Sequence, residues 1–443
     1  MTGSNTERHS GIGIYIHIPF CRSKCYYCDF NSYPGMEHLA GSYFEALFTE
    51  IALRARSIRG RRVKSIFIGG GTPSLVDPDY IARLMEVCAK LLELDNVVEI
   101  TMESNPGMLS FESLKKYRAA GINRLSIGLQ AWQDRLLKDM GRIHRRRHFI
   151  DNFNAACEAG FENINVDLIF GLPGQAFEDW AETLEAVLSL RGRSRGLTHV
   201  SCYSLSIEEG TVFGERMKQG ALAAADEELD RLMYRHAVET LSRNGYRHYE
   251  ISNFALPGFE CRHNLIYWKA MEYAGFGAGA HSFLDGVRFS NKADVRQYID
   301  AVDRLAGGGK DGGNTAGTGG GNCGMSGGNA TGHGSAGGRG DGAAHACLCN
   351  MAGVETGLFE DIRVIGRREA MSEYMILGLR LTDGVSPDEF EERFGEQLQD
   401  VYGSQLEKLA GKGLLERVDR NGVRYRLTRR GLDFANQAFM EFI

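Results

Sequence analysis

The chain has 443 residues, of which 43% are hydrophobic, enough for two or three globular domains with buried cores. Its formal net charge of −6 at pH 7 excludes the basic excess with which proteins neutralise nucleic-acid backbones. No run of eighteen apolar residues occurs and the N-terminus is polar, so we expect a cytoplasmic protein that is not integral to a membrane.

The first half of the chain alternates short β-rich runs with helix-patterned stretches, which is typical of βα units around a parallel sheet. Asp77 is expected to cap the start of one helix, with Pro78 at its first position. Another helix is expected to begin at Ser110 and to end at Gly121. The fold class is therefore α/β, with a partial (β/α)6-type barrel over residues 1–210. Its six predicted strands are Gly13–Ile18, Lys64–Ile68, Val97–Met102, Arg124–Leu129, Asn163–Ile169 and His199–Leu205.

Polar motifs follow the predicted strands. Cys21 follows the first strand, Gly69–Pro73 the second, Glu103–Pro106 the third and Gln130 the fourth, while Asp167 lies in the fifth. In barrels of this kind, ligand-binding residues lie at the carboxyl ends of the strands. The sequence therefore predicts one site at the barrel mouth.

Cys21, Cys25 and Cys28 lie within eight positions, so a single loop can wrap a metal group. A closed structural site would use four protein ligands, whereas three leave one position open for another chelator. A zinc site with His17 as fourth ligand is the weaker alternative. Of the other cysteines, Cys88, Cys157 and Cys202 are expected to be small buried side chains.

The second half divides into three predicted parts. Residues 211–305 form a helical extension, and residues 306–353 form a Gly-rich insert that cannot bury enough apolar surface to fold. Residues 354–443 form a helical, winged-helix-like domain with a hairpin around Asn421–Gly422. A metal or haem role for Cys347 and Cys349, beside His333 and His345, is the less favoured interpretation of the insert's end.

The CxxxCxxC spacing, set in Tyr15-Ile-His-Ile-Pro-Phe-Cys21, resembles the radical S-adenosylmethionine (SAM) superfamily. The resemblance implies a [4Fe-4S] cluster on Cys21, Cys25 and Cys28, with SAM on the open iron. In that superfamily one electron from the cluster cleaves SAM to a 5′-deoxyadenosyl radical, and the protein orients the cofactor.

The order of the motifs is similar to that of the oxygen-independent coproporphyrinogen oxidase group, and this likeness spans nearly the whole chain outside the insert. It implies SAM contacts at Tyr15, Tyr27, Gly70, Gly71, Thr72, Glu103, Gln130, Arg142 and Asp167. The residue types agree: glycine amides and the Thr72 hydroxyl suit the methionyl end of SAM. Arg142 suits its carboxylate, Glu103 its ammonium group or ribose, and Asp167 a ribose hydroxyl.

Two features separate the branches of that group. The oxidases carry a fourth cysteine two positions after the triad, where this chain has Phe30. The motif His263-Asn264-Leu-Ile-Tyr267-Trp268 is similar to HNxxYW of the haem chaperone branch (HemW), which binds haem and passes it to acceptor haemoproteins. His263 can ligate haem iron axially, with Tyr267 and Trp268 against the porphyrin. The alternative is a core histidine with an aromatic pair on one helix turn.

The expected function is therefore that of a haem chaperone with haem, SAM and a [4Fe-4S] cluster, whose partners are haem and a haem-accepting protein. Coproporphyrinogen III oxidation is the alternative, and another radical SAM reaction is third. The sequence leaves open whether SAM is cleaved, which protein accepts haem, and the oligomeric state.

Overall fold

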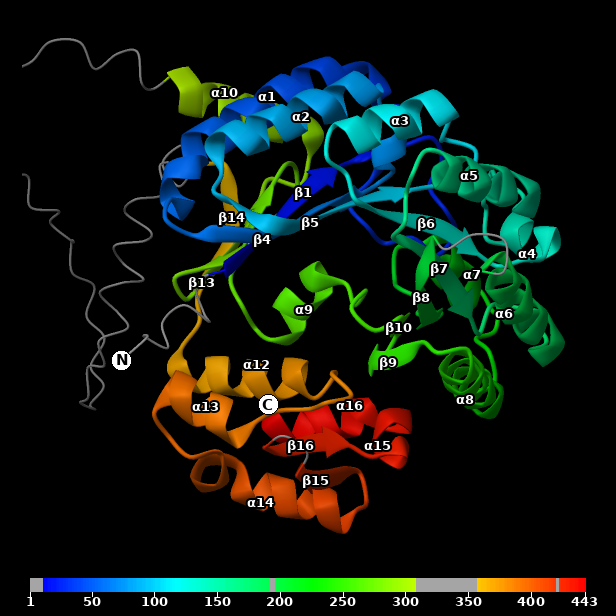
Figure 1. Cartoon of the computed structure of the whole chain (residues 1–443), viewed down its shortest axis with the longest axis vertical. Coiled ribbons are helices and arrows are strands. Elements are labelled where there is room, and N and C mark those ends of the chain that lie inside the picture. Colours follow the sequence, from blue (N-terminus) through cyan, green and yellow to red (C-terminus); the bar gives the residue numbers. More distant parts are fainter. Residues whose placement is uncertain (1–10, 192–195, 308–356, 420–421) are drawn as a thin grey trace, which may run out of the picture.

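The computed structural model describes residues 11–191, 196–307, 357–419 and 422–443 (Figure 1). Within them, a curved 12-stranded sheet has the order β14-β13-β12-β11-β1-β4-β5-β6-β7-β8-β10-β9. The six predicted strands are all present and parallel, and the structure confirms an α/β fold with an open, partial barrel. They are β1 (Gly11–Ile18), β4 (Arg62–Gly70), β5 (Leu94–Ser104), β6 (Arg124–Gln130), β7 (Ile164–Phe170) and β8 (Leu197–Ser204).

Strand β1 lies in the middle of the sheet. It pairs in parallel with β4 on one side and with β11 (Tyr273–Phe276) on the other. Seven of its eight residues are buried, as expected for a strand with both faces covered. The strand that leads into the cysteine loop is thus held along both edges.

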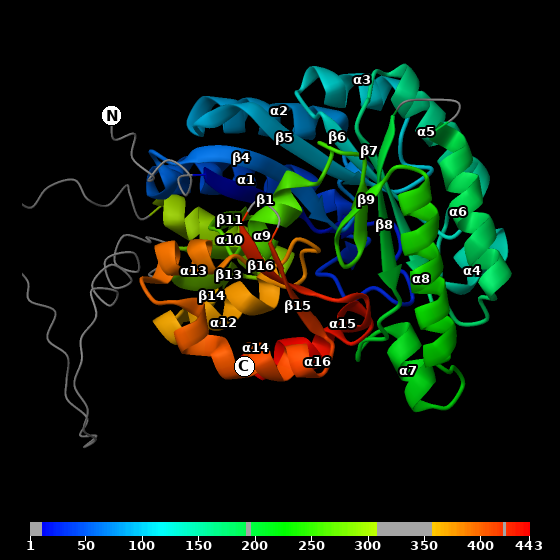
Figure 2. The ribbon, with the colours of Figure 1, turned by 60° about the horizontal axis from the view of Figure 1, so that its bottom comes forward.

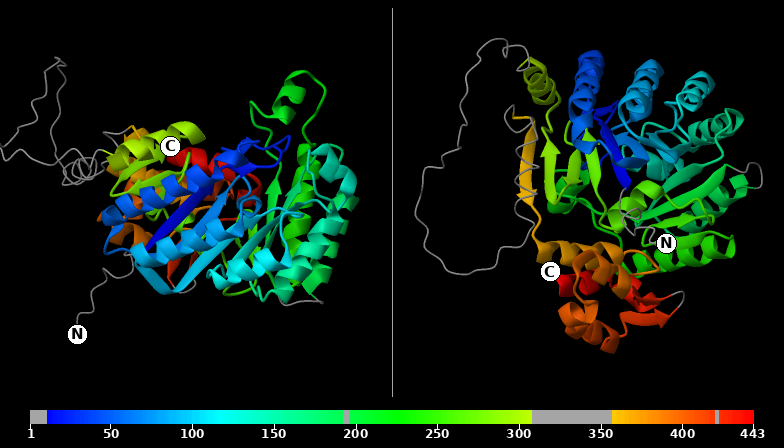
Figure 3. Two further views of the ribbon diagram at one scale, coloured as in Figure 1. Left: turned by 90° about the horizontal axis from the view of Figure 1, so that it is seen from above. Right: turned by 60° about the vertical axis from the view of Figure 1, so that its left-hand side comes forward.

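Helices cover the convex side of the sheet, and Figure 3 shows most of them in one row. The predicted helix ends are confirmed. Asp77 accepts a hydrogen bond from Asp79 N ahead of Pro78, and Ser110 accepts one from Ser113 N. Gly121 follows the second of these helices with a φ of 96°. The helices are α1 (Ala40–Arg54), α2 (Pro78–Leu91), α3 (Phe111–Ala119), α4 (Asp134–Asp139), α5 (Arg146–Glu158), α6 (Phe177–Arg191), α8 (Glu227–Arg243) and α10 (Val295–Gly307).

The predicted helical extension, residues 211–305, differs from expectation because it also contains five strands. They join both sides of the parallel sheet: β9 and β10 follow β8, and β11 to β13 continue from β1. These strands have three to five residues and become stable only by pairing with strands distant in sequence, so local patterns do not reveal them. Besides β11, the elements are α7 (Val212–Lys218), β9 (Arg247–Glu250), β10 (Asn253–Ala255), α9 (Arg262–Trp268), β12 (His281–Leu284) and β13 (Val287–Asn291).

A second hydrophobic core, which begins at Met371, forms the C-terminal domain. Strand β14 (Phe359–Val364) pairs with β13 in the large sheet, although the sequence analysis placed residues 354–443 in the C-terminal domain. The predicted helices and hairpin are present, while Asn421 of the turn lies outside the described residues. The elements are α12 (Arg367–Gly378), α13 (Pro387–Phe394), α14 (Leu398–Gly411), β15 (Leu415–Asp419), β16 (Val423–Leu427), α15 (Arg429–Asp433) and α16 (Ala435–Phe439).

Helix α9, which carries the HNxxYW motif, lies between the sheet and α12 of the C-terminal domain (Figures 1 and 2). The guanidinium of Arg393 donates hydrogen bonds to the carbonyl oxygens of Lys269 and Ala270 at the end of α9. The Arg380 guanidinium lies 4.3 Å from the centre of the Trp268 ring. The end of the motif thus contacts the C-terminal domain.

One earlier prediction concerns residues that the structure leaves aside. Most of the Gly-rich insert, including Cys347, Cys349, His333 and His345, lies outside the described residues. In the described part of the chain, none of the helices has the length and apolar content needed to cross a bilayer.

Candidate functional site

The cysteine loop leaves the sheet just after β1. Cys21 ends β2 (Phe20–Cys21), which pairs in parallel with β3 (Tyr33–Pro34) and so closes the loop. The Cys28 amide donates to Cys25 O at 3.2 Å. All three cysteines are free thiols and line one cavity of about 340 Å³. Burial raises the pKa of the Cys21 and Cys28 thiols, and a bound cation would lower it again and favour the thiolate forms.

The loop suits a larger group than a single metal ion. In the ranges that the structure describes, no three Cys, His, Asp or Glu side chains are gathered as the ligands of one ion would be. A four-iron cluster holds its cysteine ligands farther apart, as three thiols around a wide cavity allow. His17 is not available as a zinc ligand, because its ring nitrogens bond Tyr15 Oη at 2.9 Å and Asn31 O at 2.7 Å.

The glycine turn after β4 forms the next wall. The Gly71 amide donates to Ile18 O at 2.8 Å, and the Thr72 amide donates to Phe20 O at 2.8 Å. A Cβ on Gly71 would lie 2.6 Å from Phe20 O, and Gly70 has a φ of 113°. Only glycine fits where the backbone of this turn approaches the backbone of Phe20 so closely. Because the turn has no side chain here, its backbone stays accessible to a ligand.

Glu103 is the second-last residue of β5 and lies beneath the glycine turn. Its Oε2 accepts from the Gly70 amide at 3.0 Å. Burial, and secondarily the charge of Asp167, raise the pKa of this carboxyl to about 8. A bound cationic group would reverse that shift by pairing with the carboxylate. Glu103 is therefore suited to an ammonium group inside the cavity.

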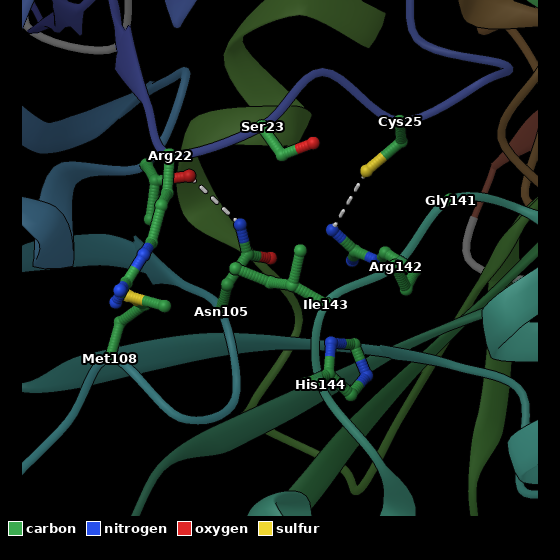
Figure 4. Close-up of a pocket in the computed structure, with 10 residues that line it drawn as sticks. Arg22, Ser23, Cys25, Asn105, Met108, Gly141, Arg142, Ile143 and His144 are labelled. Atoms are coloured by element: carbon green, nitrogen blue, oxygen red, sulfur yellow. Dashed lines mark hydrogen bonds between the residues drawn. The ribbon is translucent and has the colours of Figure 1, made fainter. Parts of the chain in front are cut away.

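Arg142 lies opposite, beyond β6. Its Nη1 is 3.5 Å from Cys25 Sγ (Figure 4), and its Nη2 donates to Gly128 O at 3.0 Å. Its Nε is buried and has no hydrogen-bond partner among the described residues. A fixed, partly unsatisfied guanidinium beside the cysteine loop fits the carboxylate of a ligand such as SAM.

The ends of β6 and β7 complete this cavity. Gln130, which follows an irregularity in the pairing of β6 with β7, has a φ of 70°, a strained conformation for a residue with a side chain. Asp167 accepts from Ser126 Oγ at 2.7 Å and from Asn165 Nδ2 at 2.8 Å. These two donors fix the carboxylate in the cavity wall, where it can receive a ligand hydroxyl.

The structure thus brings eight of the nine candidate SAM residues to the cavity that the three cysteines line. They are Tyr27, Gly70, Gly71, Thr72, Glu103, Gln130, Arg142 and Asp167. Tyr15 instead lines a neighbouring cavity. Two further groups line the cavity without a specific predicted role. They are Asn105 of the Glu103–Pro106 motif, whose amide donates to Thr72 Oγ1 at 2.9 Å, and Tyr203–Ser206 at the end of β8. The strand-end rule that found the other motifs also covers these residues.

His263 is buried inside the protein. Its Nδ1 is 2.9 Å from Ser65 Oγ and its Nε2 is 3.0 Å from Tyr267 Oη, and its ring stacks on Phe67. Burial, with a smaller contribution from Arg124, lowers the pKa of His263 to about 3. Ligation of haem iron by His263 would require one of these two hydrogen bonds to break.

The remaining described cysteines lie away from the cavity. Cys88 and Cys202 are buried in the main hydrophobic core, while Cys157 is partly buried and packs against it. Cys261 is buried before α9, with its sulfur 3.5 Å from Glu99 Oε1. Only the cysteines of the CxxxCxxC motif therefore share the cavity, among those that the structure describes.

Comparisons with known proteins add findings of three kinds: family models, curated relatives and a solved structure. Residues 15–187 match the family model of the Radical SAM superfamily, and residues 365–434 match that of the HemN C-terminal domain. The haem chaperone HemW of Lactococcus lactis is 34% identical over 97% of this chain and 96% of that protein. HemW of Bacillus subtilis is 35% identical over 97% of this chain and 98% of that protein. A solved structure of coproporphyrinogen III oxidase HemN from Escherichia coli aligns with this chain with a TM-score of 0.74 at 22% identity. The alignment covers 98% of this chain and 90% of that one and shows a shared fold.

Proposed function

Because the chain belongs to the HemW family of haem chaperones, with a radical SAM domain that implies a [4Fe-4S] cluster and SAM, we propose that it binds haem and passes it to acceptor haemoproteins. The observation that carries this proposal is that the similarity to HemW spans almost the whole of both chains. The oxidase HemN supports only the fold, at 22% identity.

Phe30 also favours the chaperone over the oxidase. It occupies the position at which the oxidases carry their fourth cysteine. Its side chain is 63% exposed at the rim of the cavity that the three cysteines line, which we call the SAM cavity. A phenyl ring can neither ligate a metal nor transfer a proton. It offers apolar surface beside the cofactors instead.

In this proposal the chain's own residues hold the cofactors. Cys21, Cys25 and Cys28 would ligate three irons of the cluster and leave one iron to SAM. Arg142 would pair with the carboxylate of SAM and Asp167 would accept from its ribose. When bound, the cluster and SAM supply one-electron chemistry. The protein orients SAM and limits its contact with water.

The ligand role of the cysteines can be tested by substitution. We expect Cys25→Ser to lose most of the iron and sulfide bound after anaerobic reconstitution. Cys202→Ser is the matched control, because Cys202 is buried in the core and does not line the loop's cavity, so this variant should keep its iron. Equal iron content in the two variants would contradict the proposed ligands.

The function is tested by titrating haem into the reconstituted protein, with and without SAM, while following the Soret band. A parallel assay measures release of carbon dioxide from coproporphyrinogen III. We expect stoichiometric haem binding and no decarboxylation. Decarboxylation without haem binding would identify an oxidase and overturn the proposal.

A further inference from the structure

A second cavity, of about 400 Å³, lies next to the SAM cavity and shares Phe30, Gly70 and Glu103 with it. We call it the His281 cavity. It is bounded by β1, the cysteine loop, α9, the start of β11 and the β11–β12 turn. Its remaining walls include Tyr15, Tyr267, Tyr273 and His281. The ligands of the two cavities would lie side by side, divided by the glycine turn and Glu103.

His281 is the histidine in this cavity whose ring remains free. It begins β12, is exposed, and forms no hydrogen bond or ion pair through its ring with any residue in the described ranges. The other histidine of the cavity, His17, uses both ring nitrogens. A neutral imidazole with free nitrogens is a common axial ligand of haem iron.

The walls suit a flat, largely apolar ligand. The rings of Tyr267 and Tyr273 meet edge to face, 4.7 Å apart. The exposed ring of Phe30 would be covered by such a ligand, which makes binding favourable by removing apolar surface from water. At the same rim, Lys24 Nζ donates to Phe30 O at 3.1 Å and supplies a cation within reach of a carboxylate.

The HNxxYW motif gains a different role in this arrangement. His263 does not line the His281 cavity, but its Nε2 lies 3.0 Å from the hydroxyl of Tyr267, which does. Ser65 holds the other nitrogen of the ring at 2.9 Å. His263 is thus a positioning residue that fixes Tyr267 in the cavity wall.

We propose that the His281 cavity is the haem site, with His281 as the axial ligand of the iron and Phe30, Tyr267 and Tyr273 along the porphyrin. The propionates would point toward solvent near Lys24. This assignment rests on the proposed function, because the cargo is haem only if the protein is a haem chaperone. It places haem beside the SAM cavity, and it assigns the iron ligand to His281 on β12 instead of His263 on α9.

The test is a haem titration of the reconstituted full-length protein and three variants. His281→Ala removes the proposed ligand. His38→Ala is the matched control, since His38 is exposed and lines neither cavity. His263→Gln keeps hydrogen-bonding capacity on α9 but cannot ligate iron as imidazole does. The readouts are haem affinity, the Soret maximum and the electron paramagnetic resonance spectrum of ferric haem, with iron and sulfide content as the measure of folding.

We expect His281→Ala to weaken haem binding by about tenfold or more and to lose the signature of histidine ligation. Added imidazole should restore that signature, while His38→Ala and His263→Gln keep it. Wild-type affinity and spectrum in His281→Ala would overturn the assignment, and their loss in His263→Gln alone would assign the iron to α9. If the wild-type protein binds no haem at all, the proposed function itself fails.

Discussion

The guanidinium of Arg142 joins the cysteine loop to the central sheet, with Nη1 3.5 Å from Cys25 Sγ and Nη2 donating to Gly128 O. A Cβ on Gly128 would lie 2.7 Å from that same Nη2, so the glycine makes room for the arginine. The positive charge is therefore fixed at the point where the cluster and SAM would meet.

Replacing Arg142 should weaken SAM binding. We expect Arg142→Gln to lower the affinity by about 10- to 100-fold, because a hydrogen bond to a charged group is worth about 1.5–3 kcal/mol. Anaerobic titration calorimetry on the reconstituted protein measures this affinity. Arg145→Gln is the control, since Arg145 is exposed and outside the cavity. Equal affinities in the two variants would rule out the carboxylate role of Arg142.

Glu103 should make the stability of the cofactor-free protein depend on pH. Its folded pKa of about 8 lies above the unfolded value near 4.5. Between these values the folded state holds a proton that the unfolded state has lost, so stability falls as pH rises. From pH 6.5 to 8, the free energy of unfolding should fall by at most about 1.4 kcal/mol per pH unit.

The comparison that isolates this effect uses urea denaturation at several pH values. The Glu103→Gln variant should lack the decline, whereas Glu112→Gln, at an exposed position on α3, should keep it. The window begins at pH 6.5 because buried His17 and His263, with pKa values of about 4 and about 3, affect stability only below it. Parallel curves for wild type and Glu103→Gln would show that the carboxyl titrates normally.

A methyl group at Gly71 should disturb the cysteine loop. The contact it would make is with the Phe20 carbonyl oxygen, which belongs to the backbone and cannot rotate away. We expect Gly71→Ala to incorporate less than half of the wild-type iron and to unfold more easily by about 1–3 kcal/mol. Gly403→Ala, at an open position in α14, should bind iron normally. Normal iron content in both variants would show that the turn tolerates a side chain.

The contact between α9 and the C-terminal domain should depend on Arg380. Its guanidinium lies over Trp268 and is 3.8 Å from Glu250, whose carboxylate is fully buried. Removing it loses the ring contact and leaves that carboxylate without its cation. We expect Arg380→Ala to lower the free energy of unfolding by about 1–3 kcal/mol. Arg417→Ala, at an exposed position on β15, should change it little, and equal denaturation midpoints would contradict the expectation.

The parallel strands and helix ends could be predicted because their signals are local. Ser110 and Gly121 mark a helix through their own hydrogen bonding and backbone conformation. The pairing of β11 with β1 could not be predicted in this way, because it joins segments about 260 residues apart and β11 has only four residues. The strands at both sides of the sheet were missed for that reason.

The residues of the candidate site could likewise be predicted only where the signal is local. Strand-end position placed Glu103, Gln130 and Asp167 around one cavity, as the structure has them. Tyr15 was grouped with them, but it lies within β1, ahead of the strand end, and lines the neighbouring cavity. His263 has the chemistry of a metal ligand, and only the tertiary contacts of Ser65 and Tyr267 reveal that its nitrogens are already bonded.

The place of β1 in the sheet has a consequence for biosynthesis. The strand is made before the other strands of the sheet, yet its second parallel partner, Tyr273–Phe276, leaves the ribosome more than 250 residues later. Until then one edge of β1 exposes unpaired backbone groups, next to three cysteines that can bind metal or oxidise. A growing chain thus carries an open edge and a reactive loop together, and the two are covered only when β11 has paired with β1 and the cluster has been inserted.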